Sequence, residues 1–226
     1  MAAFYQKFLR KNIDLSPLGV MRREDNNPYF CTPRGASIFG WAGVDGIHFC
    51  FVRGFGETVF AVSPMNGGRD CVHVIARNFA GFLRLLLATG DSAALEQAWQ
   101  WDEAQFAAFL AENPPTDEQK AVLSQIAAAF DLTPMERPWQ YLHELQAEFD
   151  PSKLKFTEEF YDPEMNPDAP ERKEDWKVYF DGSLWGYHGR GRAGREISVQ
   201  KWFQWAGRDW FVPSVYVCAK GIVVDF

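Results

Sequence analysis

The sequence contains little of what disulfide frameworks and membrane spans require. Its 226 residues include only four cysteines, which lie in apolar runs without any C-x-x-C pair, as reduced and buried thiols do. No apolar run approaches the roughly 20 residues of a transmembrane helix, and charge interrupts the N-terminus too early for a signal peptide. We therefore expect a cytoplasmic protein that does not enter a membrane.

The motifs of common catalytic sites are missing as well. There is no G-x-S-x-G, and the glycine-rich segment 187–195, Y-H-G-R-G-R-A-G-R, lacks the G-K-(S/T) ending and the following helix of a phosphate-binding loop. A thiol in an apolar strand has a raised pKa, whereas a nucleophilic thiol needs a lowered one. A small hydrolase would need His48 or His73 within hydrogen-bond reach of an acid or a thiol. We expect no enzyme and no cofactor.

Charge and composition limit the classes of partner. The chain is 47% hydrophobic and 23% charged, with a net charge of −7, which argues against a general binder of nucleic acids or anionic membranes. A local basic patch remains compatible with that total. The abundant aromatics, 20 Phe, 9 Trp and 7 Tyr, suit hydrophobic cores and partner surfaces alike.

The fold prediction begins from residues 72–90, V-H-V-I-A-R-N-F-A-G-F-L-R-L-L-L-A-T-G. A short β-like run leads to Asn78, a favourable N-cap, and Gly90 marks the end of the following helix. A helix this apolar must lie against a sheet. Its apolar residues recur at i, i+3, i+4, i+7 and i+8, as in an amphipathic helix: Phe79, Phe82, Leu83, Leu86 and Leu87.

The neighbouring segments predict the sheet and more helices. Four β-runs joined by glycine turns indicate an antiparallel meander that the central helix closes. Three further helices have start signals: Asp102 with Gln105, Thr116 with Gln119, and a stronger box from Thr133 to Glu136 with proline at N1. A short helix precedes the sheet near residues 4–12. The predicted strands of the meander cover residues 37–41, 47–52, 58–62 and 71–76.

The C-terminal part differs in composition. Residues 151–175 are acidic and contain prolines, which predicts a solvated linker or a long surface loop. Four β-runs follow at 177–184, 196–205, 210–217 and 222–226. We predict an α+β protein, with an antiparallel meander, packed helices, a helical middle and a second β-rich part. We predict a single domain over residues 1–226. It could be subdivided into a first part, residues 1–150, and a β-rich part, residues 176–226, which would complete or extend the sheet of the first part.

One stretch is similar to a known family. The order of a glycine turn, strands G-I-H-F-C-F-V, T-V-F-A-V-S-P and V-H-V-I-A, and helix N-F-A-G-F-L-R-L-L-L resembles the SUKH superfamily over residues 37–90. The resemblance implies a non-enzymatic α+β binding module, acting as a bacterial immunity protein that neutralises a toxin domain or as a regulatory adaptor. The family's recognisable A-x-(S/N)-F-x-x-F-L is matched by Ala76, Asn78, Phe79, Phe82 and Leu83.

Two pairs of histidine and cysteine, each with one residue between its members and in opposite order, are the candidate for a metal site. His48-x-Cys50 and Cys71-x-His73 each place both side chains on one face of a strand, so two strands could offer zinc a Cys₂His₂ set. In a meander, however, the 58–62 strand separates them by about 10 Å, twice the spacing between neighbouring strands. We therefore favour buried packing residues over zinc ligands.

The basic, aromatic segment 184–210 is the candidate partner surface. Tryptophan, tyrosine and arginine dominate the binding energy of protein interfaces, and arginine beside stackable rings is also typical of single-stranded nucleic-acid platforms. A core hairpin with solvated arginines is the simplest interpretation, protein binding comes second, and nucleic-acid or anion binding is third because of the net negative charge. The candidate residues are Trp185, Tyr187, Arg190, Arg192, Arg195, Trp202 and Trp205.

Overall fold

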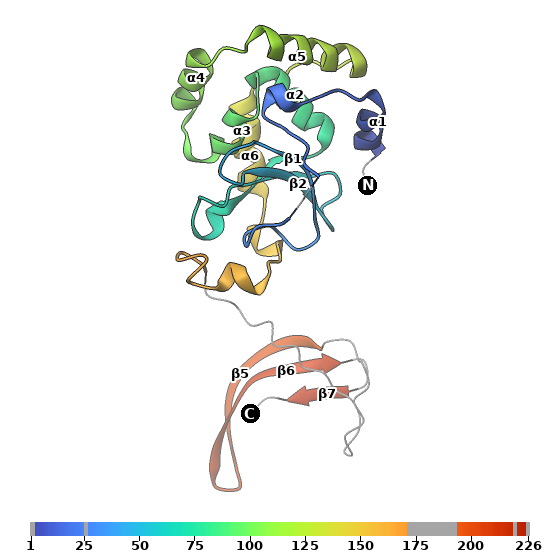
Figure 1. Cartoon of the computed structure of the whole chain (residues 1–226). Coiled ribbons are helices and arrows are strands. Elements are labelled where there is room, and N and C mark those ends of the chain that lie inside the picture. Colours follow the sequence, from blue (N-terminus) through green and yellow to red (C-terminus); the bar gives the residue numbers. More distant parts are fainter. Residues whose placement is uncertain (1–2, 25–26, 171–193, 219–220, 225–226) are drawn as a thin grey trace. The chain divides into compact units, whose positions relative to one another are not determined.

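A computed structural model describes residues 3–24, 27–170, 194–218 and 221–224 (Figure 1). Contacts divide the chain into two compact units, Met1–Glu171 and Arg172–Phe226. Each unit is described below by itself. The expectation of one domain over 1–226 stays a prediction.

The first unit contains a four-stranded antiparallel sheet. Strands β1 (Ala36–Trp41), β2 (His48–Val52), β3 (Val59–Val62) and β4 (Val72–Ala76) follow one another in the order β1-β2-β3-β4. Every residue of β2 and β3 is buried, because both faces of the sheet are covered. That burial explains the nearly continuous apolar runs, and the strand order confirms the predicted meander.

Helix α2 (Phe79–Thr89) packs on one face of this sheet, as predicted. The Asn78 side chain caps the helix by accepting from the Gly81 N–H at 2.8 Å. Gly90, with φ of +90°, ends the helix, and its N–H donates to the Leu86 carbonyl. The buried face is wider than the predicted stripe, since Leu85 is fully buried and Leu87 only partly.

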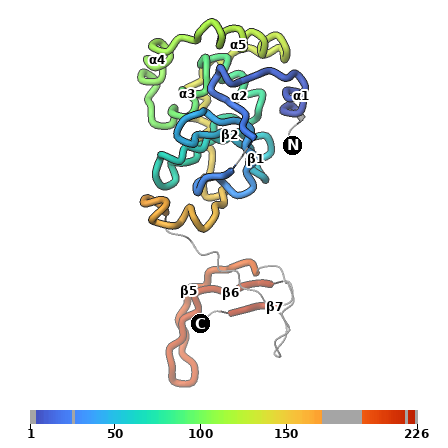
Figure 2. Tube along the Cα trace, in the orientation of Figure 1, coloured from blue at the N-terminus to red at the C-terminus, as the bar shows by residue number. Residues whose placement is uncertain are grey.

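The other helices surround α2 and the edge of the sheet (Figures 1 and 2). Helix α6 lies along strand β4, where the Gln146 side chain donates to the Val74 carbonyl at 3.3 Å. This contact covers an edge that would otherwise expose unpaired backbone groups. The helices are α1 (Ala3–Lys11), α3 (Ala93–Gln97), α4 (Glu103–Glu112), α5 (Asp117–Phe130) and α6 (Pro138–Glu148).

Two of the three predicted capping boxes are confirmed. The side chain of Asp102 accepts from the Gln105 N–H, and the side chain of Gln105 accepts from the Asp102 N–H. Thr116 and Gln119 form the same reciprocal pair at the start of α5. The predicted box at Thr133 is wrong, because α6 begins at Pro138 instead. Arg84 bonds to the preceding, non-helical segment: its Nε donates to the Thr133 carbonyl and its carbonyl accepts from the Met135 N–H, both at 3.0 Å.

The acidic segment after α6 is folded onto the sheet face opposite α2 (Figure 1). Two short 3₁₀ turns, Pro151–Lys153 and Glu158–Tyr161, bring Phe160 into the core cluster on that face. Asn166 is buried, and its Oδ1 accepts from the Gly68 N–H at 2.9 Å. Of the two predicted alternatives, residues 151–170 match the long surface loop and not the solvated linker: most of their side chains are exposed, while Leu154, Phe160 and Asn166 are buried and anchor the segment.

The second unit contains a three-stranded antiparallel sheet in the order β5-β6-β7. Strands β5 (Arg195–Trp205), β6 (Arg208–Cys218) and β7 (Gly221–Val224) match three of the predicted β-runs, and the run at 177–184 lies outside the described residues. The predicted α+β class, with a helical middle and a second β-rich part, is confirmed. No helix within the described ranges has the length and hydrophobicity that crossing a membrane would require.

Candidate functional site

His48 is buried and fully hydrogen-bonded. Its Nδ1 lies 2.8 Å from the Gly46 carbonyl, which can only accept, so Nδ1 carries the proton. Its Nε2, 3.1 Å from the Thr32 hydroxyl, is then the acceptor, while Thr32 accepts from the Tyr29 N–H at 2.8 Å. Burial lowers the pKa of His48 to about 4. The ring is a neutral packing residue whose two hydrogen-bond partners, a carbonyl and a hydroxyl, are neither acids nor thiols.

Cys50 and Cys71 belong to a cluster of thiols on the sheet face opposite α2, which also contains Cys31. A hydrogen bond to Cys71 and burial raise the pKa of Cys31, and burial raises the pKa of Cys50 to about 12. The hydrogen bond from Cys31 lowers the pKa of Cys71, whose thiol also contacts the Asn66 carbonyl. The burial of Cys31 was expected, but its position beside Cys50 and Cys71 was not, because its irregular segment has no periodicity that could place it on a face.

His73 faces a different neighbourhood. Its Nε2 lies 2.8 Å from the Asp70 carbonyl, and its ring stacks on Trp99 with centroids 4.5 Å apart. The prediction that Cys71 and His73 share a strand is wrong, because Cys71 ends the 3₁₀ turn Gly68–Cys71 and only His73 lies on β4. Strand β3 also separates β4 from β2, which carries His48 and Cys50. Among the residues that the structure describes, no group of three or more His, Cys, Asp or Glu could hold a metal ion.

The candidate partner surface is only partly within the described residues. Trp185, Tyr187, Arg190 and Arg192 lie outside them, whereas Arg195, Trp202 and Trp205 all lie on strand β5. Trp202 is 70% exposed and Trp205 is 67% exposed. These are large apolar side chains at the surface of the second unit.

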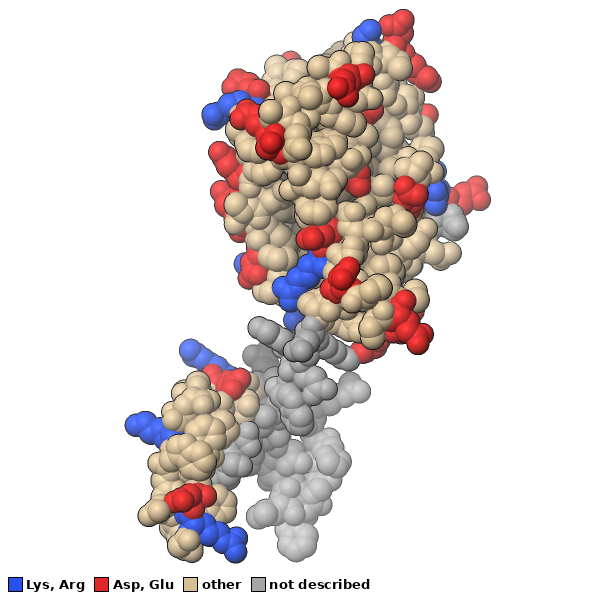
Figure 3. Space-filling model, turned by 90° about the vertical axis from the view of Figure 1, so that its left-hand side faces the viewer, with Lys and Arg blue, Asp and Glu red and all other residues tan. Residues whose placement is uncertain are grey.

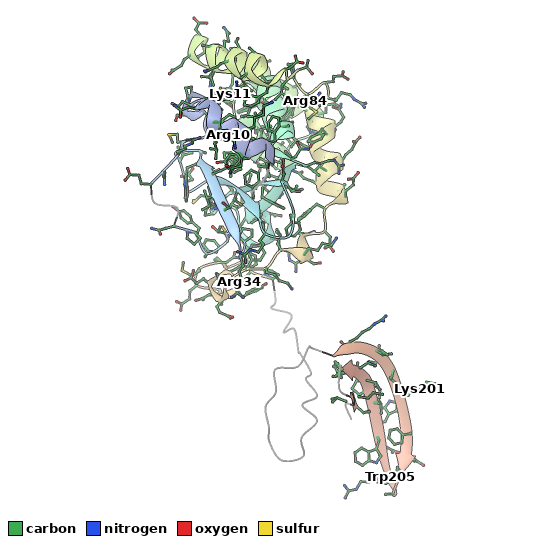
Figure 4. All side chains as sticks on the ribbon, turned by 90° about the vertical axis from the view of Figure 1, so that its right-hand side faces the viewer. Arg10, Lys11, Arg34, Arg84, Lys201 and Trp205 are labelled. Atoms are coloured by element: carbon green, nitrogen blue, oxygen red, sulfur yellow. The ribbon has the colours of Figure 1, made fainter. Side chains whose placement is uncertain are left out.

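The pairing register separates the two tryptophans. Residues directly opposite in an antiparallel pair share a face, and faces alternate along each strand. Trp202 pairs with Phe211 and stacks on it with centroids 4.9 Å apart. Trp205 lies on the other face, which we call the aromatic–basic face. Its residues are Lys201, Phe203, Trp205, Arg208 and Trp210. Figure 4 labels Lys201 and Trp205 on strand β5.

The aromatic–basic face is stabilised by contacts across the hairpin. The Trp210 Nε1 donates to the Trp205 carbonyl at 3.2 Å, and the two indole rings lie 6.2 Å apart. Lys201 and Arg208 are exposed beside these rings. The face thus combines exposed aromatic surface with positive charge. It lies next to the two-residue turn that joins β5 to β6, which is formed by Ala206 and Gly207, both with positive φ.

Charge is unevenly divided between the two units. Residues 1–171 contain 24 Asp and Glu against 14 Lys and Arg, a net charge of −10. Residues 172–226 contain 6 against 9, a net charge of +3, and the two values sum to the −7 of the chain. Figure 3 shows acidic side chains spread over the surface of the first unit.

The first unit also contains a cavity of about 370 Å³ that the sequence did not reveal. It lies between the β1–β2 turn, the loop after β3, and helix α3. Its lining includes three carboxylates, those of Asp45, Asp91 and Glu96. No sequence motif marks it, because these residues come from segments far apart in the chain.

Comparison of the chain with models of known protein families, with curated proteins and with solved structures finds no match.

Proposed function

We propose that this chain is a non-enzymatic protein-binding module, of the immunity or regulatory-adaptor kind that its resemblance to the SUKH superfamily implies. The observation that carries the proposal is the aromatic–basic face of the β5–β6 hairpin. A partner that covers this face would remove the aromatic side chains from water. The proposed location is cytoplasmic.

Interface energetics support this use of the hairpin. Exposed apolar patches on soluble proteins mark interaction sites, and tryptophan and arginine are the residues most enriched among interface hot spots. Trp205 and Arg208 lie opposite each other on neighbouring strands. Together with Phe203 and Trp210 they combine large rigid area with a charged group that can pair with a carboxylate.

The buried residues support a role without catalysis. A general base must reach the proton that it takes, but His48 is enclosed by Thr32, Gly46 and Trp41. The net charge of −7 would assist encounter with a toxin of net positive charge, because opposite charges steer association. The part of the toxin that meets the aromatic–basic face would present carboxylates to Lys201 and Arg208.

The experiment is protection of growing cells from a toxin domain. The immunity role predicts a toxin domain encoded beside the gene. The full chain is co-expressed with that domain, and growth is compared for wild type, Trp205→Ser and Trp202→Ser. The two tryptophans are similarly exposed on one strand but lie on opposite faces, so Trp202→Ser is the matched control. We expect protection by wild type and the control and its loss in Trp205→Ser. A wild-type chain that gives no protection would contradict the immunity role.

The same face favours a second candidate, binding of single-stranded nucleic acid. Lys201 and Arg208 flank Trp205 and Trp210, and stacking beside cations is how such strands are held. Replacing both cations by Gln should then lower the slope of log affinity against log salt by about 1.4, from roughly 0.7 per phosphate contact. A protein-binding role requires no such slope.

A further inference from the structure

The cavity in the first unit has an acidic interior. Glu96 is only 9% exposed, and its Oε1 accepts from the Ser63 hydroxyl at 2.8 Å. Burial raises the pKa of Glu96, and the nearby charge of Asp45 adds to this rise. None of the cavity-lining residues that the structure describes is a lysine, arginine or histidine. The carboxylates of the cavity are therefore not neutralised from within its wall.

The rest of the cavity lining is part polar and part apolar. The polar side chains are those of Ser63, Asn66, Ser92, Gln97 and Gln100. Phe49 and Ile47 are buried side chains of the wall. Val44 and Met65, which also line the cavity, are 60% and 74% exposed. Carboxylates beside these apolar side chains match a ligand that has an aliphatic stem and a cationic head. The volume, about 370 Å³, is at the small end of ligand pockets.

We infer that this cavity binds an ammonium or guanidinium group on an aliphatic stem, with the cation facing Glu96 and the stem against the apolar side chains. The chemistry is that of a lysine or arginine side chain, and it could come from a partner protein or from a free amine. Because the cavity and the aromatic–basic face share no residues, this inference does not depend on the proposed function.

Agmatine, the free amine that carries the guanidinium of arginine on a four-carbon stem, is the first probe. Its binding to the full chain is measured by isothermal titration calorimetry, with the neutral butylurea of similar length as the control ligand. Glu96→Gln keeps the side-chain shape and an acceptor for Ser63 while removing the charge. We expect agmatine to bind, butylurea to bind at least about tenfold more weakly, and Glu96→Gln to lose about tenfold or more, as charged hydrogen bonds require.

Two further variants separate binding from folding. Asp45 lies in an exposed turn with φ of +50°, which asparagine also accepts, so Asp45→Asn removes charge without straining the backbone. Glu112→Gln, on the exposed end of α4, changes the net charge equally outside the cavity. We expect weaker agmatine binding in Asp45→Asn and unchanged binding in Glu112→Gln. Equal loss in both variants would reduce the effect to net charge and overturn the inference.

A short peptide, acetyl-Gly-Arg-Gly-amide, distinguishes the two sources of the cation. Tighter binding of the peptide than of agmatine assigns the cavity to a side chain of a partner protein, and tighter binding of agmatine assigns it to a free amine. Either result supports the inference. If neither ligand binds, or if Glu96→Gln binds both as wild type does while keeping the wild-type melting temperature, the inference is wrong.

Discussion

Replacing His48 should remove a specific part of the protein's sensitivity to acid. The ring is enclosed and neutral, with Nδ1 donating to Gly46 and Nε2 accepting from Thr32. Its pKa of about 4 in the folded chain compares with 6.5 for an unperturbed ring. The unfolded chain therefore binds more protons between these two values, and folding stability falls as the pH falls.

The expected magnitude follows from that difference in pKa. The His48 contribution is complete above pH 6.5 and is lost progressively as the pH falls to 4. At 1.36 kcal/mol for each pKa unit, the loss at pH 4 amounts to about 3 kcal/mol. Burial also lowers the pKa of His73, which adds to the loss, whereas the raised pKa of Glu96 opposes it. His73 and Glu96 contribute equally to wild type and to His48→Gln, so their contributions cancel when the stability losses of the two proteins are subtracted.

The assay is urea unfolding at pH 7 and pH 4, followed by far-ultraviolet circular dichroism. The described helices all belong to the first unit, so their signal reports on that unit. His48→Gln starts less stable, but from pH 7 to pH 4 it should lose about 3 kcal/mol less than wild type. An equal loss in both proteins, or a His48 ring that titrates near 6.5 by NMR, would refute the account of the enclosed ring.

Three further substitutions test the local structure through the free energy of unfolding. Asn78→Ala removes the N-cap of α2 and should cost about 1 kcal/mol, whereas retained stability would contradict the cap. Thr133→Ala should cost less than Asp102→Ala, because only Asp102 caps a helix, and equal costs would restore the predicted box at Thr133. Ala206→Asn should stabilise the hairpin by about 1 kcal/mol at its φ of +53°, and destabilisation would contradict the turn geometry.

The elements that local patterns control could be predicted from the sequence. The meander and α2 followed from periodicity, with Asn78 and Gly90 as its boundaries, because a buried face repeats every two residues in a strand and every 3.6 in a helix. The predicted capping box at Thr133 was wrong because a tertiary contact, and not the local sequence, sets the conformation of this segment. Arg84, about 50 residues earlier in the chain, forms hydrogen bonds with Thr133 and Met135, and this segment is not helical.

The candidate sites depended on contacts between distant segments, which patterns do not encode. The thiol cluster joins Cys31 from an irregular loop to residues of the sheet. The cavity draws Asp45 from a turn and Glu96 from a short helix. The tryptophans of β5 were expected as a group, but the bulge between Ser198 and Lys201 and the pairing register decide which of them share a face.

A toxin domain encoded beside the gene is the partner that the immunity role predicts, and isothermal titration calorimetry of the purified full chain with that domain tests the central claim most directly. The account predicts a dissociation constant of about 1 µM or tighter, weakened at least about 30-fold by Trp205→Ser, as expected for a hot spot worth 2 kcal/mol or more, and little changed by Trp202→Ser. Absence of binding by the wild-type chain, or equal weakening by both substitutions, would contradict recognition through the aromatic–basic face.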